Sequence, residues 1–459
     1  SFRCNSGIPL LILIASRFAF TSQNNRKMTE PSLTYLRPEV ATLKEKLDEF
    51  IRDEVIPAEE AYEEHMLDRV GADRWSQSAL PPCLNSLQQE AQRRGLWNLF
   101  LPPRLWSEVP NEARQYVPST PLSYREYGIL AESMGRSELG AMACNCSAPD
   151  TGNMEVLLEF GTPQQKQDFL IPLLKGEIRS TFLMTEPQVA SSDPTNLSTL
   201  LKKVGGNHYV LEGQKWWSTG AMDPRCRVAI CVARMESSDQ QNLHGKHTIV
   251  LIPLPHPQVR MVRPLTVFGY DDAPFGHAEV ALEGVQLTSE HLVGGEGSGF
   301  KVSQARLGPG RIHHCMRAIG CAQRCYELML QRTLERKTFG KYLWQHGSVQ
   351  RDIADSFADL QAARLLTLHC AHQMDLNGPR ASRQYISSIK VAVPHLMSQV
   401  IDRAMQVHGG AGVSSDFVLV KALAGMRTLR IADGPDEVHR QSVALLELKR
   451  LYREQFGED

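Results

Sequence analysis

The residues best suited to chemistry lie in the segment 406–440, which reads QVHGGAGVSSDFVLVKALAGMRTLRIADGPDEVHR. The segment begins with a cluster of glycines, Gly409, Gly410 and Gly412, and ends with an acidic Gly-Pro turn at 433–436. Glycine lets the backbone approach a phosphate-bearing ligand closely, and a carboxylate in a Gly-Pro turn can be held rigidly at a reaction centre. We therefore predict that both ends of the segment serve one bound cofactor.

Length and composition exclude some classes of function. The chain has 459 residues, of which 50 are basic and 51 acidic, so its net charge is -1. This balance gives no bulk attraction to nucleic acid or to an anionic membrane, so anion binding must come from local sites. The ten cysteines form no C-x-x-C motif, which favours a reducing compartment over a disulfide framework.

The first residues differ in composition from the rest of the chain. Residues 1–27 hold no acid, and their basic residues are Arg3, Arg17, Arg26 and Lys27. This pattern is typical of a mitochondrial transit peptide, although 8–15 is apolar enough to imitate the core of a secretory signal. In the alternative interpretation, Met28 is the true start of the protein. We expect 1–33 to be a leader or a disordered extension. Its apolar run is too short to span a bilayer.

Apolar periodicity predicts three successive regions, of which the first is helical. A helical pattern covers 38–95, and five prolines mark 97–121 as a surface loop. Helical patterns then return over 122–134, 142–147 and 154–174. These patterns predict an N-terminal helical domain over 34–178.

The second region has the pattern of β-strands. Short runs bounded by Gly, Pro or Asn occur at 180–185, 209–213, 228–233, 248–253 and 276–282. They predict a single β domain over 179–290, with a barrel-like or sandwich architecture.

The third region is helical again. Long helical patterns follow the glycine run 294–299 and cover 300–338, 348–375, 382–408 and 432–452. Helices surround the glycine run, so we interpret it as a hinge and not as a dinucleotide fingerprint. A Gly-Pro-Gly sequence at 308–310 is expected to interrupt the first helix. The pattern predicts a C-terminal four-helix bundle over 291–459 and an α+β multidomain protein.

Four motifs in this helical, β and helical order resemble the acyl-CoA dehydrogenase family of flavoproteins. They are Thr185-Glu186-Pro187, Trp216-Trp217-Ser218-Thr219-Gly220, Arg336-Lys337-x-Phe339-Gly340 and Gln406-x-x-Gly409-Gly410-x-Gly412. The resemblance covers about 33 to 451. It implies FAD as cofactor and an acyl-CoA thioester as substrate. The four motifs carry this implication, since fold likeness alone would not settle function.

The resemblance places part of the flavin site in the loop that opens the β domain. Phe182, Met184 and Thr185 would lie along the isoalloxazine ring. Ser191 or Ser192 would meet the flavin phosphates or the CoA arm, and both alignments stay open because the loop has one extra residue. The same residues would also suit a capped turn between two strands.

Two further groups of residues are assigned to FAD by the same resemblance. Trp216 would cover one face of the flavin and Ser218 would reach a ring atom, although a Trp pair is otherwise typical of core packing. The residues expected at the pyrophosphate and adenosine half are Arg336, Phe339, Gln406, Gly409 and Gly410. An arginine suits this task because its planar fork bridges two phosphate oxygens. In related enzymes these groups reach the flavin of a neighbouring subunit, which implies a homodimer or homotetramer.

Asp433 stands where most members of the family have a glutamate base. The base removes the α-proton of the thioester while the β-hydride passes to flavin N5, and the base's own N–H helps to polarise the thioester carbonyl. Some members place the base one residue before the arginine matched by Arg306, but that residue is Ala305, which cannot accept a proton. Asp436 is assigned to helix capping instead.

The remaining site residues are also implied by the resemblance. Arg306 would contact the CoA of the substrate, and Gly434 and Ser192 would lie beside the substrate. Pro435 and Glu437 would lie beside the cofactor. No metal is expected, because His313, His314 and Cys315 are adjacent and would point in different directions on a helix.

Three stretches are similar to one eukaryotic branch of the family, whose larger members carry a phosphotransferase-like domain that this sequence lacks. They are the 308–314, 189–193 and 432–439 segments. This branch implies long or branched acyl chains, fatty-acid β-oxidation and electron-transferring flavoprotein as acceptor. We expect a mitochondrial location, in the matrix or at the inner membrane, with peroxisomes as the alternative.

Two other functions stay open: a flavin oxidase such as nitroalkane oxidase, and a non-catalytic scaffold of the same fold.

Overall fold

The computed structural model describes residues 33–236 and 245–457. Residues from Leu36 onward belong to one compact unit, and all the elements below lie in it. The predicted leader lies outside the described residues, except for its last residue. No helix in the described ranges is both long enough and apolar enough to cross a membrane.

The first region consists of helices that bury one apolar stripe each. In α2 (Pro38–Phe50) the stripe is Val40, Leu47 and Phe50, and the chain continues directly into a π-helical turn at Ile51–Val55. Ser123 and Glu126 form a capping box that starts α6. The other helices are α3 (Ala58–Leu67), α4 (Pro82–Arg93), α5 (Pro103–Trp106), α6 (Tyr124–Met134), α7 (Glu138–Ala143), α8 (Asp150–Phe160), α9 (Pro163–Gln165) and α10 (Ile171–Lys175).

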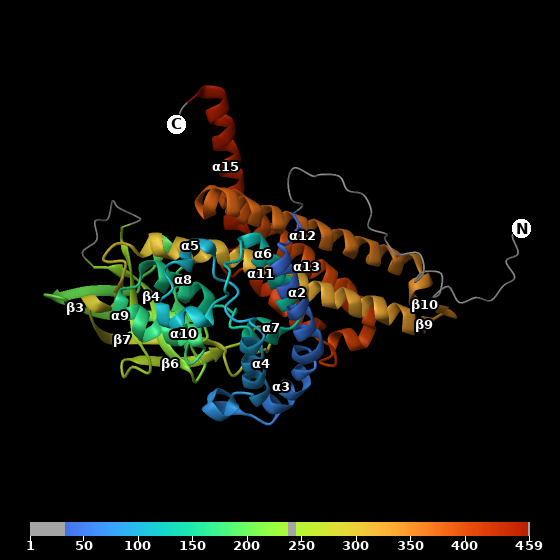
Figure 1. Cartoon of the computed structure of the whole chain (residues 1–459), viewed down its shortest axis with the longest axis horizontal. Coiled ribbons are helices and arrows are strands. Elements are labelled where there is room, and N and C mark those ends of the chain that lie inside the picture. Colours follow the sequence, from blue (N-terminus) through green and yellow to red (C-terminus); the bar gives the residue numbers. More distant parts are fainter. Residues whose placement is uncertain (1–32, 237–244, 458–459) are drawn as a thin grey trace, which may run out of the picture. The chain divides into compact units, whose positions relative to one another are not determined.

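The middle region is one mixed eight-stranded sheet, which Figure 1 shows in green and yellow-green. Its strands are β1 (Arg179–Leu183), β2 (Leu200–Gly205), β3 (His208–Thr219), β4 (Cys226–Met235), β5 (His247–Pro253), β6 (Val259–Leu265), β7 (His277–Thr288) and β8 (Leu292–Val293). They pair in the order β6-β7-β3-β2-β4-β5-β8, and β1 pairs with β4 in parallel. The runs in the sequence do not indicate β2 and β6, whose residues are mostly exposed and include two lysines and two arginines.

The third region contains long helices that lie side by side (Figure 1). They are α11 (Gly299–Glu335), α12 (Gly347–Ala381) and α13 (Arg383–His408), followed by α14 (Leu419–Leu429) and α15 (Asp436–Phe456). A two-stranded hairpin, β9 (Lys337–Thr338) and β10 (Lys341–Tyr342), separates α11 from α12. The expected interruption at 308–310 is wrong, because α11 is continuous through it.

The predicted helical, sheet and helical order is therefore confirmed. The changes of structure fall between Lys175 and Arg179 and between Val293 and Gly299. We keep 34–178, 179–290 and 291–459 as proposed domain limits.

A buried ion pair joins the loop after β1 to the sheet. Lys215 and Glu186 are both fully buried, and Lys215 Nζ donates to Glu186 Oε1 at 2.8 Å. The same ammonium donates to the carbonyls of Met184 at 2.9 Å and Val232 at 2.8 Å. Burial raises the pKa of Glu186, but Lys215 and Ser198 outweigh burial and bring the pKa down to about 2. The pair thus fixes the start of the loop that follows β1.

Replacement of this lysine tests the role of the pair. We expect Lys215→Met to lower the free energy of unfolding by about 3–5 kcal/mol, because it leaves Glu186 buried without its counter-charge. Urea denaturation measures the loss. The control is Lys202→Met, since Lys202 pairs with Glu236 at 3.4 Å on the surface. This variant should lower the free energy of unfolding by about 1 kcal/mol at most. Equal effects of both variants would contradict the assignment.

The pH dependence of the same pair has a definite sign. A carboxyl with a lowered pKa contributes stability above its unfolded pKa, and that stability is lost as the pH falls through the folded pKa. For Glu186 the loss therefore falls between its ordinary value of 4.5 and about 2.

Candidate active site

Asp433 lies in the turn between α14 and α15, and its backbone is unusual. Its φ is 55°, in the left-handed region that is uncommon for residues other than glycine, and the φ of Gly434 is 102°. The helical pattern in the sequence predicts a helix that starts at Ala432. Because of the turn, α15 begins instead at Asp436. Asp436 makes no capping hydrogen bond; instead its Oδ2 accepts from Arg430 Nε at 2.8 Å, which corrects the capping assignment.

Three side chains hold the carbonyl groups of this turn. Arg311 Nε on α11 donates to the Asp433 carbonyl at 3.0 Å, and His439 Nε2 on α15 lies 3.1 Å from the same oxygen. Lys390 Nζ on α13 donates to the carbonyls of Gly434, at 3.3 Å, and Leu429. Lys390 is 1% exposed. The strained turn is therefore fixed from three helices at once.

The side chain of Asp433 is only a quarter exposed, and around it lie the imidazole of His314 and the cations of Arg306, Arg311 and Lys390. Burial raises the pKa of its carboxyl, but His314, Arg306, Arg311 and Lys390 outweigh burial and lower the pKa below its ordinary value. Asp433 is therefore a carboxylate at neutral pH. An ionised carboxylate on a fixed backbone can serve as a general base.

Arg306 connects three elements close to Asp433. Its guanidinium carbon lies 3.9 Å from the centre of the Phe182 ring on β1, and its Nε donates to Asn153 Oδ1 on α8 at 3.1 Å. Burial lowers the pKa of Arg306, and Asp433 is the first of the acids that oppose this effect. Two residues predicted from distant parts of the sequence, Phe182 and Arg306, are thus brought together.

The helix α11 offers no competing carboxylate at the two positions nearest its arginines, Arg306 and Arg311. Its contact with the carbonyl of Asp433 comes from Arg311, and the residue before Arg311 is Gly310, which has no side chain. Neither Gly310 nor Ala305 carries a carboxylate.

The loop predicted to face the flavin is tied to β3. Thr185 Oγ1 donates to the Trp216 carbonyl at 2.7 Å, and Trp216 N donates to the Thr185 carbonyl at 3.0 Å. Ser191 Oγ accepts the Glu186 N–H at 2.9 Å, so this hydroxyl is already used. Ser192 is exposed and has no hydrogen bond to another described residue.

A bulge in β3 decides which residues of the Trp-Trp-Ser-Thr motif are accessible. The register of β3 with β7 shifts between Lys215 and Ser218. Ser218 is fully buried with an unpaired hydroxyl, whereas Trp217 is 40% exposed with a φ of 52°. Thr219 Oγ1 lies 2.9 Å from His277 Nδ1. The sequence had pointed to Trp216 and Ser218, and period-two alternation fails here because of the bulge.

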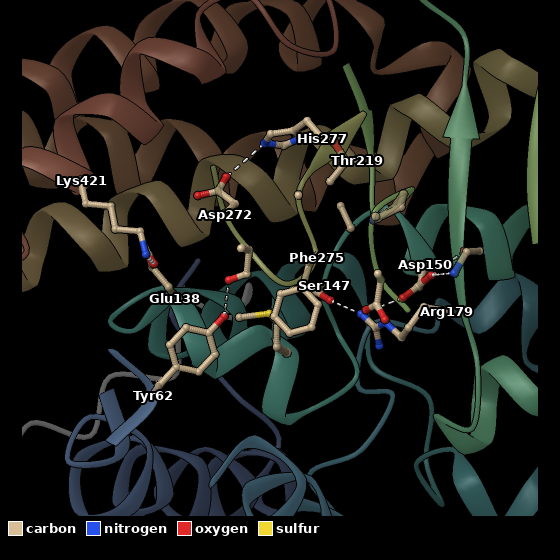
Figure 2. A pocket seen from close by; sticks show the side chains of 18 residues that line it. Tyr62, Glu138, Ser147, Asp150, Arg179, Thr219, Asp272, Phe275, His277 and Lys421 are labelled. Atoms are coloured by element: carbon tan, nitrogen blue, oxygen red, sulfur yellow. Dashed lines mark hydrogen bonds and ion pairs between the residues drawn. The ribbon is translucent and has the colours of Figure 1, made fainter. Parts of the chain in front are cut away.

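A cavity of about 240 Å³, partly lined by Thr219, holds several charged side chains, and none of the residues predicted for the site lines it. Figure 2 shows Asp150 and Arg179 on one side and Glu138 and Lys421 on the other. Its charges are paired with one another, as in the contact of 2.7 Å between Arg179 Nη2 and Asp150 Oδ2. These residues are scattered in the sequence and form no motif.

The residues predicted for the pyrophosphate and adenosine half lie at the other end of the long helices. Arg332 Nη2, one turn before the end of α11, donates to the His408 carbonyl at the end of α13, at 3.5 Å. The group is exposed; its members are Arg336, Phe339, Gln406, Gly409 and Gly410. An α-helix rises 1.5 Å per residue, so Arg336 lies roughly 37 Å along α11 from Arg311. The structure does not bring this group to Asp433 within one chain.

The exposed group fits a phosphate-bearing ligand. The side chains of Arg336 and Gln406 have no hydrogen bond to another described residue, and nothing lies within 4 Å of a Cβ built on Gly409 or Gly410. A free guanidinium beside open backbone is what a pyrophosphate needs.

The two other residues predicted to lie beside the cofactor are at the start of α15. Pro435 precedes its first residue, and the side chain of Glu437 is 80% exposed and lies 3.8 Å from Arg440. No group of three or more His, Cys, Asp or Glu in the described ranges is placed to hold a metal.

Comparison with known families decides what this arrangement belongs to. The acyl-CoA dehydrogenase N-terminal, middle and C-terminal domain families match residues 114–177, 181–285 and 297–445. The chain belongs to the acyl-CoA dehydrogenase family. The predictions of family, of an oxidoreductase and of FAD as cofactor are confirmed at this level.

Individual relatives agree with this membership. The probable acyl-CoA dehydrogenase IBR3 of Arabidopsis thaliana is 45% identical over 90% of this chain and 50% of its own length. A solved structure of a putative acyl-CoA dehydrogenase from Mycobacterium abscessus is 42% identical, with a TM-score of 0.84 over 91% of this chain and 100% of that one. A glutaryl-CoA dehydrogenase from Mycobacterium smegmatis in complex with FADH2 shares the fold, with 18% identity and a TM-score of 0.70 over 92% and 96%. The chain spans about half the length of most curated plant and animal relatives that it matches.

The conformation of Gly434 can be tested directly. A Cβ at this position would lie 2.6 Å from His439 Nε2, and its positive φ would be strained for any other residue. We expect Gly434→Ala to displace His439 from the turn, to cost about 1–3 kcal/mol in stability and to remove most turnover. Thermal melting and steady-state rates measure the two effects.

The matched control for this variant is Gly425→Ala. Gly425 lies inside α14 with nothing within 4 Å of a built Cβ. Because alanine favours a helix over glycine by about 0.5–1 kcal/mol, this variant should be neutral or stabilising. An active, stable Gly434→Ala enzyme would show that the turn does not need its present shape.

Proposed function

We propose that this chain dehydrogenates an acyl-CoA thioester between its α- and β-carbons, with Asp433 as the base that removes the α-proton. The observation that carries the proposal is an ionised carboxylate on a backbone held by Arg311, Lys390 and His439. FAD, when bound, supplies the acceptor of the β-hydride. The chain's own part is to hold the thioester, to take the proton at Asp433 and to stabilise the negative charge that moves onto the thioester oxygen.

The backbone of the turn offers donors for that oxygen. The N–H groups of Asp433 and Gly434 have no hydrogen bond to any other described residue. Unpaired N–H donors beside the base are suited to polarise a thioester carbonyl. This supports the expected contact of Gly434 with the substrate.

The proposed FAD site draws on two sets of residues. Phe182, Met184, Thr185, Trp216 and Ser218 stay the predicted contacts of the flavin ring. For the phosphates we favour Ser192 over Ser191, because only the hydroxyl of Ser192 is unused in the loop. The second set is the exposed group at the ends of α11 and α13, defined above.

Asp433→Asn is the direct test of the base. The amide has the same shape but accepts no proton, so we expect FAD to stay bound and kcat to fall by about 10²–10⁴-fold. Visible flavin absorbance measures the first effect, and acyl-CoA turnover the second. Asp416→Asn is the control, since Asp416 is an exposed aspartate in the same segment. Retention of most turnover in Asp433→Asn would refute the assignment.

We also propose that the active protein is a homodimer or a dimer of dimers whose FAD sites are shared between subunits. A single flavin cannot reach from Asp433 to Arg336 when roughly 37 Å of α11 lies between them, because its ring and phosphates are joined by a short ribityl chain. A second copy in a symmetric pair would supply Arg336, Gln406 and the glycines to each site.

Mixed dimers separate a shared site from a site within one chain. We expect Arg336→Ala to weaken FAD binding roughly tenfold or more, because it removes a charged hydrogen bond to phosphate. The variant is therefore assayed at a low FAD concentration that leaves its homodimer empty. A dimer of one Asp433→Asn chain and one Arg336→Ala chain then has one intact site, and should show roughly half of native activity. Inactive mixed dimers would place both residues in one chain's site.

The remaining features of the function are proposals that rest on the sequence. The likeness to the eukaryotic branch supports long or branched acyl chains, β-oxidation and electron-transferring flavoprotein as acceptor. The acid-free, Arg-containing 1–27 segment supports a mitochondrial location, with peroxisomes as the alternative.

The aspartate base also suits a flavin oxidase such as nitroalkane oxidase. Bleaching of the flavin in anaerobic titration with acyl-CoA thioesters would support the dehydrogenase, whereas peroxide production from a nitroalkane would support the oxidase.

A further inference from the structure

His314 lies beside the proposed base, and about a quarter of its side chain is exposed. It lies on α11, three residues beyond Arg311, and its Nε2 is 3.3 Å from Asp433 Oδ2. Its other ring nitrogen, Nδ1, lies 3.2 Å from Arg317 Nη2. Arg317 is itself fixed, because its Nη1 donates to the Cys146 carbonyl at 3.2 Å.

These contacts determine which tautomer the ring adopts. A guanidinium only donates hydrogen bonds, so Nδ1 of His314 must accept from Arg317. Burial, and then the charge of Arg317, lower the pKa of His314 to about 4, which leaves the ring neutral near pH 7. A neutral ring that accepts at Nδ1 carries its one proton on Nε2. The Nε2–H group is therefore the one beside the carboxylate of Asp433.

We propose that His314 is a positioning residue that holds Oδ2 of Asp433 and leaves Oδ1 to take the α-proton of the substrate. The inference rests on the proposed function, in which Asp433 is the base. An aspartate has one side-chain carbon fewer than a glutamate, so its carboxylate has less freedom to find the substrate. The Arg317–His314 pair supplies a fixed donor at 3.3 Å from Oδ2, and catalytic hydrogen bonds that are long without substrate tighten in the complex with it.

His314 has a second effect, on the acidity of Asp433. A donor that approaches the charged form of a carboxyl lowers its pKa, so His314, at 3.3 Å from Oδ2, helps to keep Asp433 ionised. The other charged or titratable groups that face Asp433 in the described part of the chain are Arg306, Arg311 and Cys315 on α11, Lys390 on α13 and His439 on α15. Loss of His314 removes one contribution among several, so the carboxyl should stay titratable but at a higher pH.

The neighbouring His313 provides a matched control. It is more deeply buried than His314, with 2% of its surface exposed, and it packs edge-on against the Tyr127 ring with centroids 4.6 Å apart, while its Nε2 has no partner among the described residues. His313→Phe keeps this ring contact and should leave the activity unchanged. Any general effect of altering a buried histidine on α11 would appear in this variant as well.

The test uses the FAD-loaded full chain with His314→Leu, which removes the donor, and His314→Gln, whose side-chain amide can place an N–H near the position of Nε2. One readout is the pH profile of kcat/KM. The second is exchange of the α-hydrogens with deuterated water, measured by mass spectrometry on a thioester with sulfur in place of the β-carbon. Such a compound can lose its α-proton but has no β-hydride to transfer.

We expect His314→Leu to lower kcat and the exchange rate by roughly 10- to 100-fold and to move the acid limb of the profile up by roughly one pH unit. His314→Gln should restore both to within about threefold of the native protein. A native exchange rate and an unshifted limb in His314→Leu would overturn the inference, and so would failure of His314→Gln to restore them in protein that binds FAD and melts normally. Native exchange in Asp433→Asn would instead overturn the proposed base, which separates the two outcomes.

Discussion

The left-handed turn at Asp433 and Gly434 is the constraint on which the rest of the site depends. A residue with a side chain keeps such a conformation only where its surroundings hold it. The carbonyls of the turn accept from Arg311, Lys390 and His439, which come from α11, α13 and α15. The dependence is mutual, because a guanidinium or ammonium in the protein interior also needs hydrogen-bond acceptors. The packing of these helices and the shape of the turn are therefore one feature.

The charges around the turn suit the movement of a proton. Arg306 and Arg311 lie near Asp433 although burial lowers the pKa of both. When Asp433 takes a proton, its negative charge disappears from this cluster, and a new negative charge develops on the thioester oxygen of the substrate. Positive groups that neutralise the carboxylate before the transfer are then placed to stabilise the new charge afterwards. The site needs no rearrangement of charge on the protein beyond the proton itself.

The architecture followed from local patterns, and the site followed only in part. Periodicity found the long helices and the sheet because each buries a continuous apolar stripe or alternating face. It misplaced the start of α15 because the sign of φ at Asp433 is not visible in the sequence. It also gave no sign of the bulge in β3 beside Trp216 and Ser218, where the register with β7 shifts. The family motifs located Asp433, but they gave no information about what holds it.

The residues that hold Asp433 were missed for physical reasons. A histidine or lysine on a helix usually reaches solvent, so neither His314 nor Lys390 stood out. Lys390 did leave a signal, since it lies in the same stripe as Ile386 and Val393, which are buried in α13. A cation in the middle of an apolar stripe must find acceptors in the protein interior. Such a position therefore points to backbone carbonyls that need a donor, which here are those of the turn.

The segment 406–440 contains both predicted functions, but the structure separates them. From Lys390, which contacts Gly434, α13 runs for roughly 27 Å to His408, and α14 then returns the chain to the turn. Gly409 and Asp433 are close in sequence and lie at opposite ends of α13. The glycines and the base of one chain thus cannot serve the two halves of one flavin. The uninterrupted length of α11 and α13 is what makes a second copy necessary in the proposed site, and a break at 308–310 would have removed that need.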